Sequence, residues 1–418
     1  MSDVIVIGGG PAGLGAAIAL GRHGVRTLVV ERSRFPVDKP CGEGLLANAV
    51  TRLEELGISR GELAAAGRPL RGLRYVSAQG RQAELGFGDG AAFGVERTAL
   101  SRLLLRRARS LPCVEVLEGV SASLRWTDAG APEVWVGPER LRPRLVIGAD
   151  GLASRLRREA GLRTRFVEPR RWGVRQHFEL APWSDRVEVH FADGMEAYVT
   201  PLERGVNLAF LWEPARFEAA PAAGLIRSLL ARFPALERRL APRGATDRAR
   251  ASGPLYQRVE GPPIAGLVLV GDAGGYVDAL TGEGVGLALA QARALESLLV
   301  ARLSSGQARD VLGAAELQPV TAELRRVCRA SHRFTRLLLE LSRRPELFEH
   351  VIAALACDAE LFAHFAGVSA GERGLLRVPG ASLLRLPSTA LAALRAVRPG
   401  SRRSPRGAET RHALRNST

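Results

Sequence analysis

The residues near the start of the chain have the types and the spacing of a nucleotide site. Gly8, Gly10 and Gly13 form a Gly-x-Gly-x-x-Gly pattern directly after an apolar run. The first glycine permits a tight turn, the second lets the backbone approach a pyrophosphate, and the third lets a helix and a strand pack closely. Glu31, eighteen residues after Gly13, stands where a carboxylate can accept hydrogen bonds from a ribose. Together these residues predict that the chain binds a dinucleotide.

Two further apolar runs end in glycine and aspartate, and they indicate which dinucleotide is bound. The second run leads into Ala149-Asp150-Gly151, and the third leads into Gly271 and Asp272. An aspartate after the third run would be placed to bind the ribityl chain or the pyrophosphate of an extended FAD. Ten residues on, the turn with Gly282 and Gly284 begins a long helix. Its free N–H groups would face the flavin edge that becomes negative on reduction, so we expect FAD rather than NAD.

These residues need elements that position them, and the apolar patterns predict those elements. A strand at 4–7, a helix at 11–23 and a strand at 26–31 make a βαβ unit. The patterns downstream predict helical structure at 42–68, short strands between 70 and 95, a helix at 96–109, a strand at 145–148, a strand at 262–272, a helix at 284–303 and further helices at 315–365.

The residue pattern changes between about 165 and 260, where apolar and polar residues alternate. The alternating segments are 172–180, 186–191, 197–200 and 206–212, and this pattern is typical of a sheet with one covered face. The predicted fold class is α/β, with a Rossmann-like FAD-binding domain interrupted by a mostly β substrate domain and followed by a C-terminal helical region. The expected boundaries are 1–70, 96–164 and 262–314 for FAD binding, 71–95 and 165–261 for the substrate domain, 315–397 for the helices, and 398–418 for a basic disordered tail.

The composition is that of a globular protein with an excess of positive charge. The chain has 418 residues, 46% of them apolar, and a formal charge of +16; Lys39 is the only lysine. The basic tail also contains Pro, Gly and Ser, so we interpret it as a solvated segment rather than a nucleic-acid contact. Leucine and arginine recur through 375–397, a weakly amphipathic pattern that favours peripheral contact with a membrane surface.

Targeting and metal signals are weak. The four cysteines form no CxxC pair, and no cluster has the spacing of a metal site, so we expect no metal and a reducing cytoplasm. The chain enters its first strand without a basic leader. No apolar stretch looks long and charge-free enough to span a bilayer. The pattern gives no information on the oligomeric state.

The three glycine-bearing motifs together resemble those of the FAD-dependent aromatic hydroxylases and the geranylgeranyl reductases, which share the p-hydroxybenzoate hydroxylase fold. The resemblance covers about residues 1–310. It implies that Asp150 helps to hold the FAD and NAD(P)H region, that Arg97 lies near the cofactor, and that the middle β domain roofs the substrate pocket. The expected cofactor-binding residues are Gly8, Gly10, Ala12, Gly13, Glu31, Arg32, Arg97, Asp150, Gly271, Asp272, Gly282, Gly284 and Val285.

Two segments bear on which branch of this superfamily the chain follows. Pro40-Cys41-Gly42-Glu43-Gly44 is similar to the Pro-Cys-Gly loop of the geranylgeranyl reductases, which makes Cys41 or Glu43 a pocket contact; the alternative is a phosphate-side turn with an incidental cysteine. Those reductases also carry a Tyr-x-Trp-x-Phe-Pro strand. The corresponding 196–201 segment keeps only Tyr198 and Pro201, so the aromatic wall that would grip an isoprenoid is reduced.

The loss of aromatic residues from the 196–201 segment favours oxygen transfer over alkene reduction. We expect an FAD-dependent monooxygenase that uses NAD(P)H and O2, through a flavin C4a-hydroperoxide, to hydroxylate or epoxidise a small hydrophobic aromatic, polyketide- or isoprenoid-derived substrate. No second nucleotide pattern is present, so NAD(P)H would dock transiently. Arg175 and His177 share one strand face, and His190 and Tyr198 lie on neighbouring strands. The candidate catalytic residues are Cys41, Glu43, Arg175, His177 and Tyr198.

Three other functions remain as alternatives or are set aside. A reductase that saturates isoprenoid double bonds is the first alternative. A non-catalytic prenyl-binding escort on the same fold, as in the GDP-dissociation inhibitors, is a second, and the intact flavin turns argue against it. Flavin halogenases need a tunnel lysine and a Trp-x-Trp-x-Ile-Pro motif. The chain has only Lys39 and lacks that motif, so halogenation is set aside.

Overall fold

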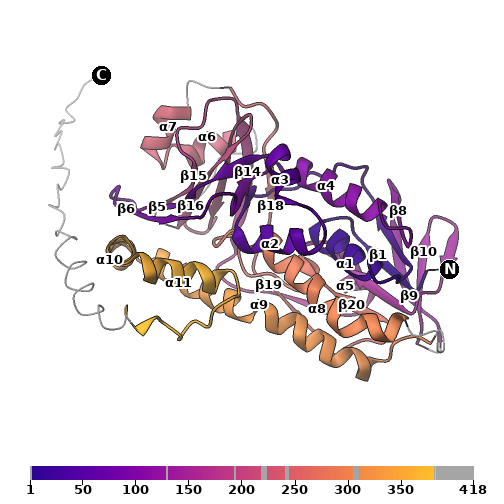
Figure 1. Ribbon diagram of the computed structural model, residues 1–418. Coiled ribbons are helices and arrows are strands. Elements are labelled where there is room, and N and C mark those ends of the chain that lie inside the picture. Colours follow the sequence, from indigo (N-terminus) through magenta and orange to yellow (C-terminus); the bar gives the residue numbers. More distant parts are fainter. Residues whose placement is uncertain are drawn as a thin grey trace, which may run out of the picture.

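A five-stranded parallel sheet carries the nucleotide motif. The computed structural model describes residues 2–128, 130–192, 194–217, 224–240, 244–304, 310–380 and 382, and Figure 1 shows their arrangement. The strand order is β20-β12-β1-β2-β8, and every neighbouring pair is parallel. The strands are β1 (Val4–Ile7), β2 (Thr27–Glu31), β8 (Val114–Glu118), β12 (Leu145–Gly148) and β20 (Leu267–Leu269).

The apolar runs of this sheet follow from its burial on both faces. One face packs on helices, chiefly α1 (Pro11–Gly21), α4 (Arg97–Arg109) and α8 (Gly284–Ser304). The other face packs on the antiparallel sheet of β9 (Ala122–Trp126), β10 (Pro132–Val136) and β11 (Glu139–Leu141). The predicted βαβ unit is confirmed. The predicted strand 262–272 is too long, because prolines at 262 and 263 cannot donate to a ladder and the chain turns into a short 3-10 helix at Gly271–Gly274.

A seven-stranded sheet forms the second layer. Its order is β18-β14-β17-β16-β15-β5-β6. All four strands predicted between 172 and 212 are confirmed in it. The strands are β5 (Gly72–Val76), β6 (Gln82–Gly86), β14 (Trp172–Phe178), β15 (Arg186–Ala192), β16 (Met195–Leu202), β17 (Gly205–Trp212) and β18 (Arg250–Ser252). One face is covered by α6 (Leu225–Leu230) and α7 (Pro234–Leu240). The opposite face looks toward the nucleotide motif and forms the roof of a cavity.

Helices close the space under one end of this roof. They are α9 (Ala314–Ser342), α10 (Pro345–Cys357) and α11 (Ala359–Ser369), and they pack on the β5 and β6 end of the sheet (Figure 1). The helices predicted at 315–365 are therefore confirmed. Of the Leu/Arg segment, 381 and 383–397 lie outside the described residues, as does the whole predicted tail 398–418.

The remaining elements connect these layers. The helices are α2 (Ala47–Glu55), α3 (Arg60–Ala66) and α5 (Arg155–Glu159). The strands are β3 (Gly44–Leu45), β4 (Arg68–Leu70), β7 (Ala92–Gly94), β13 (Arg163–Phe166) and β19 (Gln257–Glu260). The expectation of helical structure at 42–68 is confirmed except for the short strands at its ends.

One expectation about apolar stretches is wrong. Among the described residues, Gly284–Leu303 is long and apolar enough to cross a bilayer, and half of that window is buried inside the protein. The helix packs against α1, α2 and α9. A helix that is buried on several sides has the same composition as a membrane span, which explains the result. The pair α10 and α11 passes the same test only if it is counted as one span, and it is bent by 112°.

Candidate functional site

The glycine turn leaves room for a ligand on one side and none on the other. A Cβ added at Gly13 would lie 1.8 Å from the carbonyl oxygen of Gly8, and one added at Gly8, where φ is +114°, would lie 2.3 Å from that of Ala149. At Gly10 the nearest atom is Arg97 Nη2 at 3.8 Å. The turn is therefore packed tightly behind and open in front, as close approach of a pyrophosphate to a helix N-terminus requires.

The acidic end of β2 holds this turn in place. The buried carboxylate of Glu31 accepts hydrogen bonds from Gly9 N at 2.6 Å and from Ser33 N at 2.9 Å. Carboxylate oxygens have further lone pairs, so ribose hydroxyls could share them. Ala12 is buried and lines the cavity beside Gly10, whereas Arg32 is exposed beside Glu31. Their expected contacts with the cofactor remain predictions.

The third glycine motif faces the same space. Gly271 is anchored by its N–H, which donates to Gln291 Oε1 at 2.6 Å. Asp272 lines the cavity beside it, and burial raises the pKa of this carboxyl, with Lys39, Arg157 and Arg97 opposing. A Cβ at Gly282, where φ is +70°, would meet nothing within 4 Å. The first N–H groups of α8 have no partner within the helix, so they can face an electron-rich ligand edge.

One oxygen of Asp150 binds the start of a helix, and the other has no partner among the described residues. Its Oδ2 accepts hydrogen bonds from Arg155 N at 2.7 Å and Leu156 N at 3.1 Å, so it caps the N-terminus of α5. Among the described residues its Oδ1 is buried without a partner. The neighbouring residues Ala149 and Gly151 line the cavity instead. Only the free oxygen could serve a cofactor, and that role remains a prediction.

Of the basic side chains at this cavity, two lie near the glycine motifs, and one of these two had no predicted role. Arg97 is buried at the start of α4, and burial lowers the pKa of its guanidinium, with Cys41 and Glu43 opposing. Lys39 also lines the cavity, on the side of Gly151 and Asp272. Both can offset the charge of a diphosphate. The sequence singled out Lys39 only as the sole lysine.

The cavity has a volume of about 260 Å³ and lies between α8 and the seven-stranded sheet. Strand pairing places side chains of its roof in two rows that cross β14, β17 and β16. The first row is Arg175, Ala209 and Tyr198; the second is His177, Asn207 and Thr200. Apolar side chains from β15 and β17, including Val187, Val189 and Leu211, complete the roof. This lining can exclude water from a reacting centre.

The second row fastens the Cys41 loop to the roof. Thr200 Oγ1 donates to Gly42 O at 2.6 Å, and Asn207 Nδ2 donates to Cys41 O at 2.9 Å. Neither residue was predicted, although both occupy alternate positions on predicted strands. Burial raises the pKa of the Cys41 thiol, the charge of Glu43 adds to this, and Arg97 opposes it. The thiol therefore faces the cavity in its neutral form.

Glu43 and His177, both predicted as catalytic, meet directly. Glu43 Oε2 lies 2.7 Å from His177 Nε2, and Glu43 Oε1 accepts from Arg97 N at 2.8 Å. On its other side, His177 Nδ1 lies 3.0 Å from Asp247 Oδ2. Asp247 gives no signal in the sequence, because it precedes β18 in an irregular segment seventy residues from His177.

Arg175 completes this cluster. Its side chain is 1% exposed, forms an ion pair with Asp247, and reaches Asp38 Oδ1 at 2.5 Å. Burial would lower the pKa of Arg175, but the hydrogen bond of Asp38 and the charges of Glu43 and Asp38 outweigh it and raise the pKa. His190 lies elsewhere: it pairs with Glu188 at 3.1 Å, one register position from the cavity-lining Val189 and so on the opposite strand face.

The hydroxyl of Tyr198 is occupied by a hydrogen bond to the backbone. Its hydroxyl donates to Leu280 O at 2.5 Å, and burial raises the pKa of this phenol well above its usual value, with Glu196 adding to it. Glu196 lies two residues before Tyr198 on the same face of β16 and is buried in an ion cluster with Arg171 and Asp278. Burial raises the pKa of Glu196 to about 7, with Arg171 opposing. Tyr198 thus shapes the wall and cannot act as a base.

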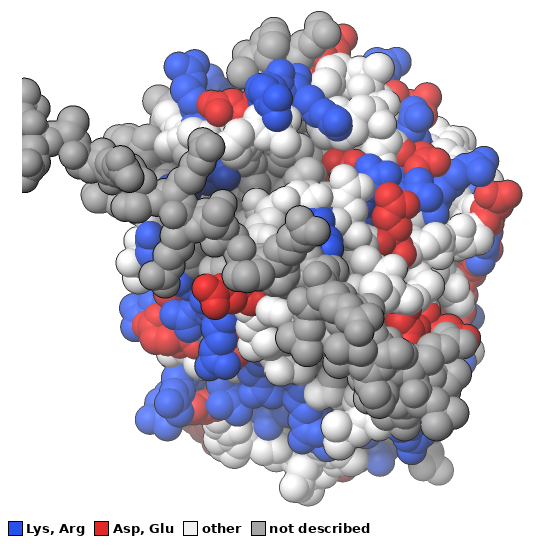
Figure 2. Space-filling model, turned by 90° about the vertical axis from the view of Figure 1, so that its left-hand side faces the viewer, with Lys and Arg blue, Asp and Glu red and all other residues white. Residues whose placement is uncertain are grey.

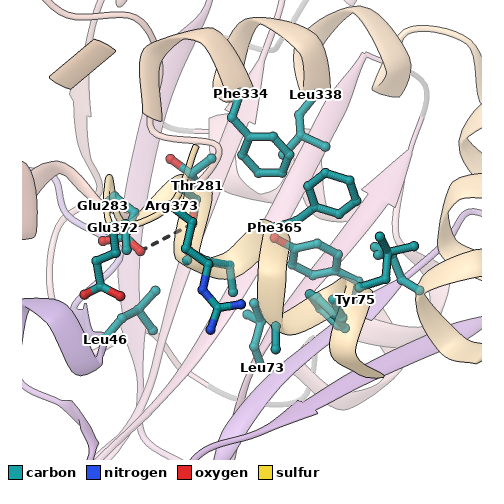
Figure 3. A pocket seen from close by; sticks show the side chains of 18 of the residues that line it. Leu46, Leu73, Tyr75, Thr281, Glu283, Phe334, Leu338, Phe365, Glu372 and Arg373 are labelled. Carbon is teal, nitrogen blue, oxygen red and sulfur yellow. Dashed lines mark hydrogen bonds between the residues drawn. The ribbon is translucent and has the colours of Figure 1, made fainter. Parts of the chain in front are cut away.

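A second, apolar chamber adjoins the cavity. It has a volume of about 350 Å³ and lies between α2, β5 and the helices α9, α10 and α11. Figure 3 shows aromatic and leucine side chains around it, with Glu283 and Glu372 together on one side. Phe334 and Phe365 stack there at 5.4 Å between ring centroids. The residues that line both spaces are Leu46, Leu73, Tyr75 and Thr281.

One end of the chamber is polar. Burial raises the pKa of Glu283 to about 7, while Asn48 Nδ2 donates to this carboxyl at 2.7 Å. On the outside, charged side chains of both signs border uncharged surface on the side of the molecule where β6 and α10 lie (Figure 2). Because the lining is apolar except at this end, the chamber suits an apolar group whose reactive part reaches the cavity.

These geometries fit an FAD. The open face of the Gly10 turn, the free oxygen of Asp150, the start of α8 and the basic side chains at positions 39 and 97 offer donors and space along one path. Among the described residues, no three His, Cys, Asp or Glu side chains are arranged to hold a metal ion.

Comparisons with known proteins agree with this fit. Residues 1–225 match the family described as FAD binding domain. Menaquinone reductase of Mycobacterium tuberculosis (strain ATCC 25618 / H37Rv) is 31% identical over 323 residues, which cover 72% of this chain and 77% of that protein. Digeranylgeranylglycerophospholipid reductase 1 of Methanopyrus kandleri is 31% identical over 320 residues, covering 69% and 77%.

A solved structure shares the fold. PqsL, a probable FAD-dependent monooxygenase from Pseudomonas aeruginosa, superimposes with a TM-score of 0.67 at 24% identity, covering 84% of this chain and 99% of that one. The similar proteins thus include flavoenzymes that are named as reductases and as monooxygenases.

The position of Asp272 yields a prediction about cofactor affinity. Asp272→Ala should weaken FAD binding by about 10- to 100-fold, because a hydrogen bond to a charged group contributes about 1.5–3 kcal/mol. Flavin fluorescence titration of the apoprotein measures this, and circular dichroism checks the fold. Asp89→Ala, at an exposed loop position, is the control. Equal affinities in the two variants would contradict the assignment of Asp272.

Proposed function

The chain belongs to the family of FAD-binding oxidoreductases matched above, and we propose that it is a monooxygenase within that family. It would use NAD(P)H and O2 to hydroxylate or epoxidise a hydrophobic aromatic, polyketide- or isoprenoid-derived substrate. A bound FAD would supply electron transfer from NAD(P)H and the activation of O2. The chain's own residues would bind the cofactor, exclude water and orient the substrate.

The observation that carries the proposal is the wall contributed by β16. At the positions where the resembling reductases have three aromatic residues, this chain has Glu196, Tyr198 and Thr200. Glu196 is held in a buried ion cluster, and Thr200 donates to the Cys41 loop. Only one of these three positions therefore carries an aromatic ring. The wall is suited to positioning a substrate with polar groups rather than to gripping a bare isoprenoid.

Each part of the site then has a defined task. The glycine turn and Asp272 would hold the diphosphate and ribityl parts of FAD, and the start of α8 would face the flavin. Val187, Val189 and Leu211 would keep water from the reacting atoms. The adjoining chamber would take the apolar part of the substrate and so set which carbon reaches the flavin. NAD(P)H would dock transiently.

Saturation of an isoprenoid double bond is the second candidate. Two observations favour it: the 31% identity to menaquinone reductase over most of both chains, and the Cys41 loop. A neutral thiol beside the flavin could donate a proton to an alkene carbon. The two reactions differ in their products, since oxygen transfer adds one oxygen atom and saturation adds two hydrogens.

Product analysis separates these candidates. The FAD-loaded protein would be incubated with NADPH or NADH and with three probes: a long-chain alkylphenol, a prenylated naphthoquinone and a geranylgeranyl lipid. We expect a product heavier by one oxygen, labelled when ¹⁸O2 is supplied and absent without O2. A product heavier by two hydrogens under anaerobic conditions would overturn the proposal in favour of the reductase. The Asp272→Ala variant serves as the control with weakened flavin binding.

The chamber predicts a dependence on chain length. Ala363, on α11, lines the chamber, and Ala363→Phe should fill part of it. We expect kcat/KM to fall more than 10-fold for a long-chain substrate and to change little for a short-chain analogue, because each buried methylene contributes about 0.8 kcal/mol. Ala359→Phe, exposed on the same helix, is the matched control. A similar loss for both chain lengths would show that the chamber does not bind the tail.

A further inference from the structure

A chain of charged side chains links the Cys41 loop to the rim of the roof, and the reaction proposed above does not use it. His177 is its central member. The ring contacts Glu43 Oε2 through Nε2 at 2.7 Å and Asp247 Oδ2 through Nδ1 at 3.0 Å, and the backbone N–H of His177 donates to Asp247 Oδ1 at 2.9 Å. Each ring nitrogen of one imidazole therefore lies against a carboxylate.

This arrangement selects the charged form of the ring. A neutral imidazole has one N–H donor and one bare nitrogen, so it can donate to only one of two carboxylates, whereas the imidazolium donates to both. Arg175 Nη1 lies 3.2 Å from Nδ1, but it also forms an ion pair with Asp247. Asp247 can thus accept from the ring and from the guanidinium together.

The charges around the ring act in both directions. Burial would lower the pKa of His177, and the hydrogen bond and charge of Glu43 outweigh burial and raise it; Arg175 lowers it and Asp247 raises it. Behind these groups, Asp38 pairs with Arg175 and with Arg250 of β18, and Arg97 N holds the other oxygen of Glu43. The balance favours a proton on the ring.

The loop that this ring contacts needs to be held. Glu43 has φ of +61° and is the one described non-glycine residue with a positive φ, a conformation that persists where the surroundings fix it. Its side chain is bound at both oxygens, and its N–H donates to Cys41 Sγ at 3.3 Å. The position of the thiol at the cavity therefore depends on the position of Glu43.

We propose that His177 is a positioning residue: as an imidazolium between Glu43 and Asp247, it holds the Cys41 loop against the roof, and loss of its proton loosens that loop. The proposal rests on the flavin site proposed above, but not on which of the two reactions occurs there. His177 acts through Glu43, and Asp247 anchors the ring from the opposite side.

The direction of the pH effect follows from the raised pKa of His177. A histidine whose pKa is higher in the folded protein stabilises the fold fully below its unfolded value of about 6.5, and this contribution is lost as the pH rises through the folded value. The loop should therefore be held at mildly acidic pH and loosened above the pKa of His177 in the folded protein.

Alkylation of Cys41 tests this without measuring turnover. The protein, with and without FAD, would be treated with iodoacetamide between pH 6 and 9.5, and labelling would be quantified for each cysteine peptide by mass spectrometry. Cys357 is exposed, so its rate corrects for reagent and solution conditions at each pH. Because burial raises the pKa of the Cys41 thiol, the ratio of the Cys41 rate to the Cys357 rate also rises as Cys41 itself ionises, and His177→Gln, which keeps this thiol, gives the baseline from which the step is measured. We expect this ratio to step upward as His177 loses its proton. In His177→Gln we expect the ratio to be at least 10-fold higher at pH 6.5 and to show no step.

Two further variants separate positioning from general destabilisation. His190→Gln removes a histidine that also pairs with a carboxylate but lies on the other face of the sheet, so it should behave as the wild type. His177→Lys keeps a positive charge to higher pH, so it should restore part of the protection and move the step upward. The proposal is overturned if His177→Gln leaves the ratio unchanged, if His190→Gln raises it equally, or if the wild type shows no step. Each of these readouts is independent of whether the protein transfers oxygen.

Discussion

The close approach of one loop to one row of the sheet determines the shape of the site. Residues Pro40–Gly44 pass beneath β14, β17 and β16, where His177, Asn207 and Thr200 stand side by side. Two of these side chains bind loop carbonyls and the third binds the carboxylate of Glu43. Because the loop comes from the nucleotide-binding part and the row from the second sheet, these bonds fix the distance between floor and roof.

A cluster of buried charges lies behind the roof, and such a cluster adds little net stability to a fold. Arg171, Glu196 and Asp278 are almost wholly buried behind the roof. Removing one partner of such a cluster typically costs about 3–5 kcal/mol, although replacing the whole cluster by apolar residues is often neutral. The cluster therefore supports β16 from behind the cavity lining.

The sequence predicted what is local and missed what depends on contacts between distant segments. The glycine turn, β1, α1 and β2 follow from spacing and periodicity, because each residue there acts through its neighbours in the chain. The contact of Asp247 with His177 could not be predicted, because Asp247 lies in an irregular segment without a pattern. Asp150 was assigned to the cofactor by resemblance, and that role remains a prediction. The sequence did not show that its other oxygen binds the first N–H groups of α5, a helix too short to show periodicity. Helix α8 has the composition of a membrane span because protein covers it on several sides.

A crystal structure of the FAD complex tests the account most directly. We expect the flavin ring between the start of α8 and the row Arg175, Ala209 and Tyr198, with the N–H groups of Gly284 and Val285 at its pyrimidine edge and Cys41 in contact with the ring. The chamber lined by Phe334 and Phe365 should open beside the ring. A flavin ring bound outside this cavity, or one separated from the chamber by a closed wall, would contradict the account.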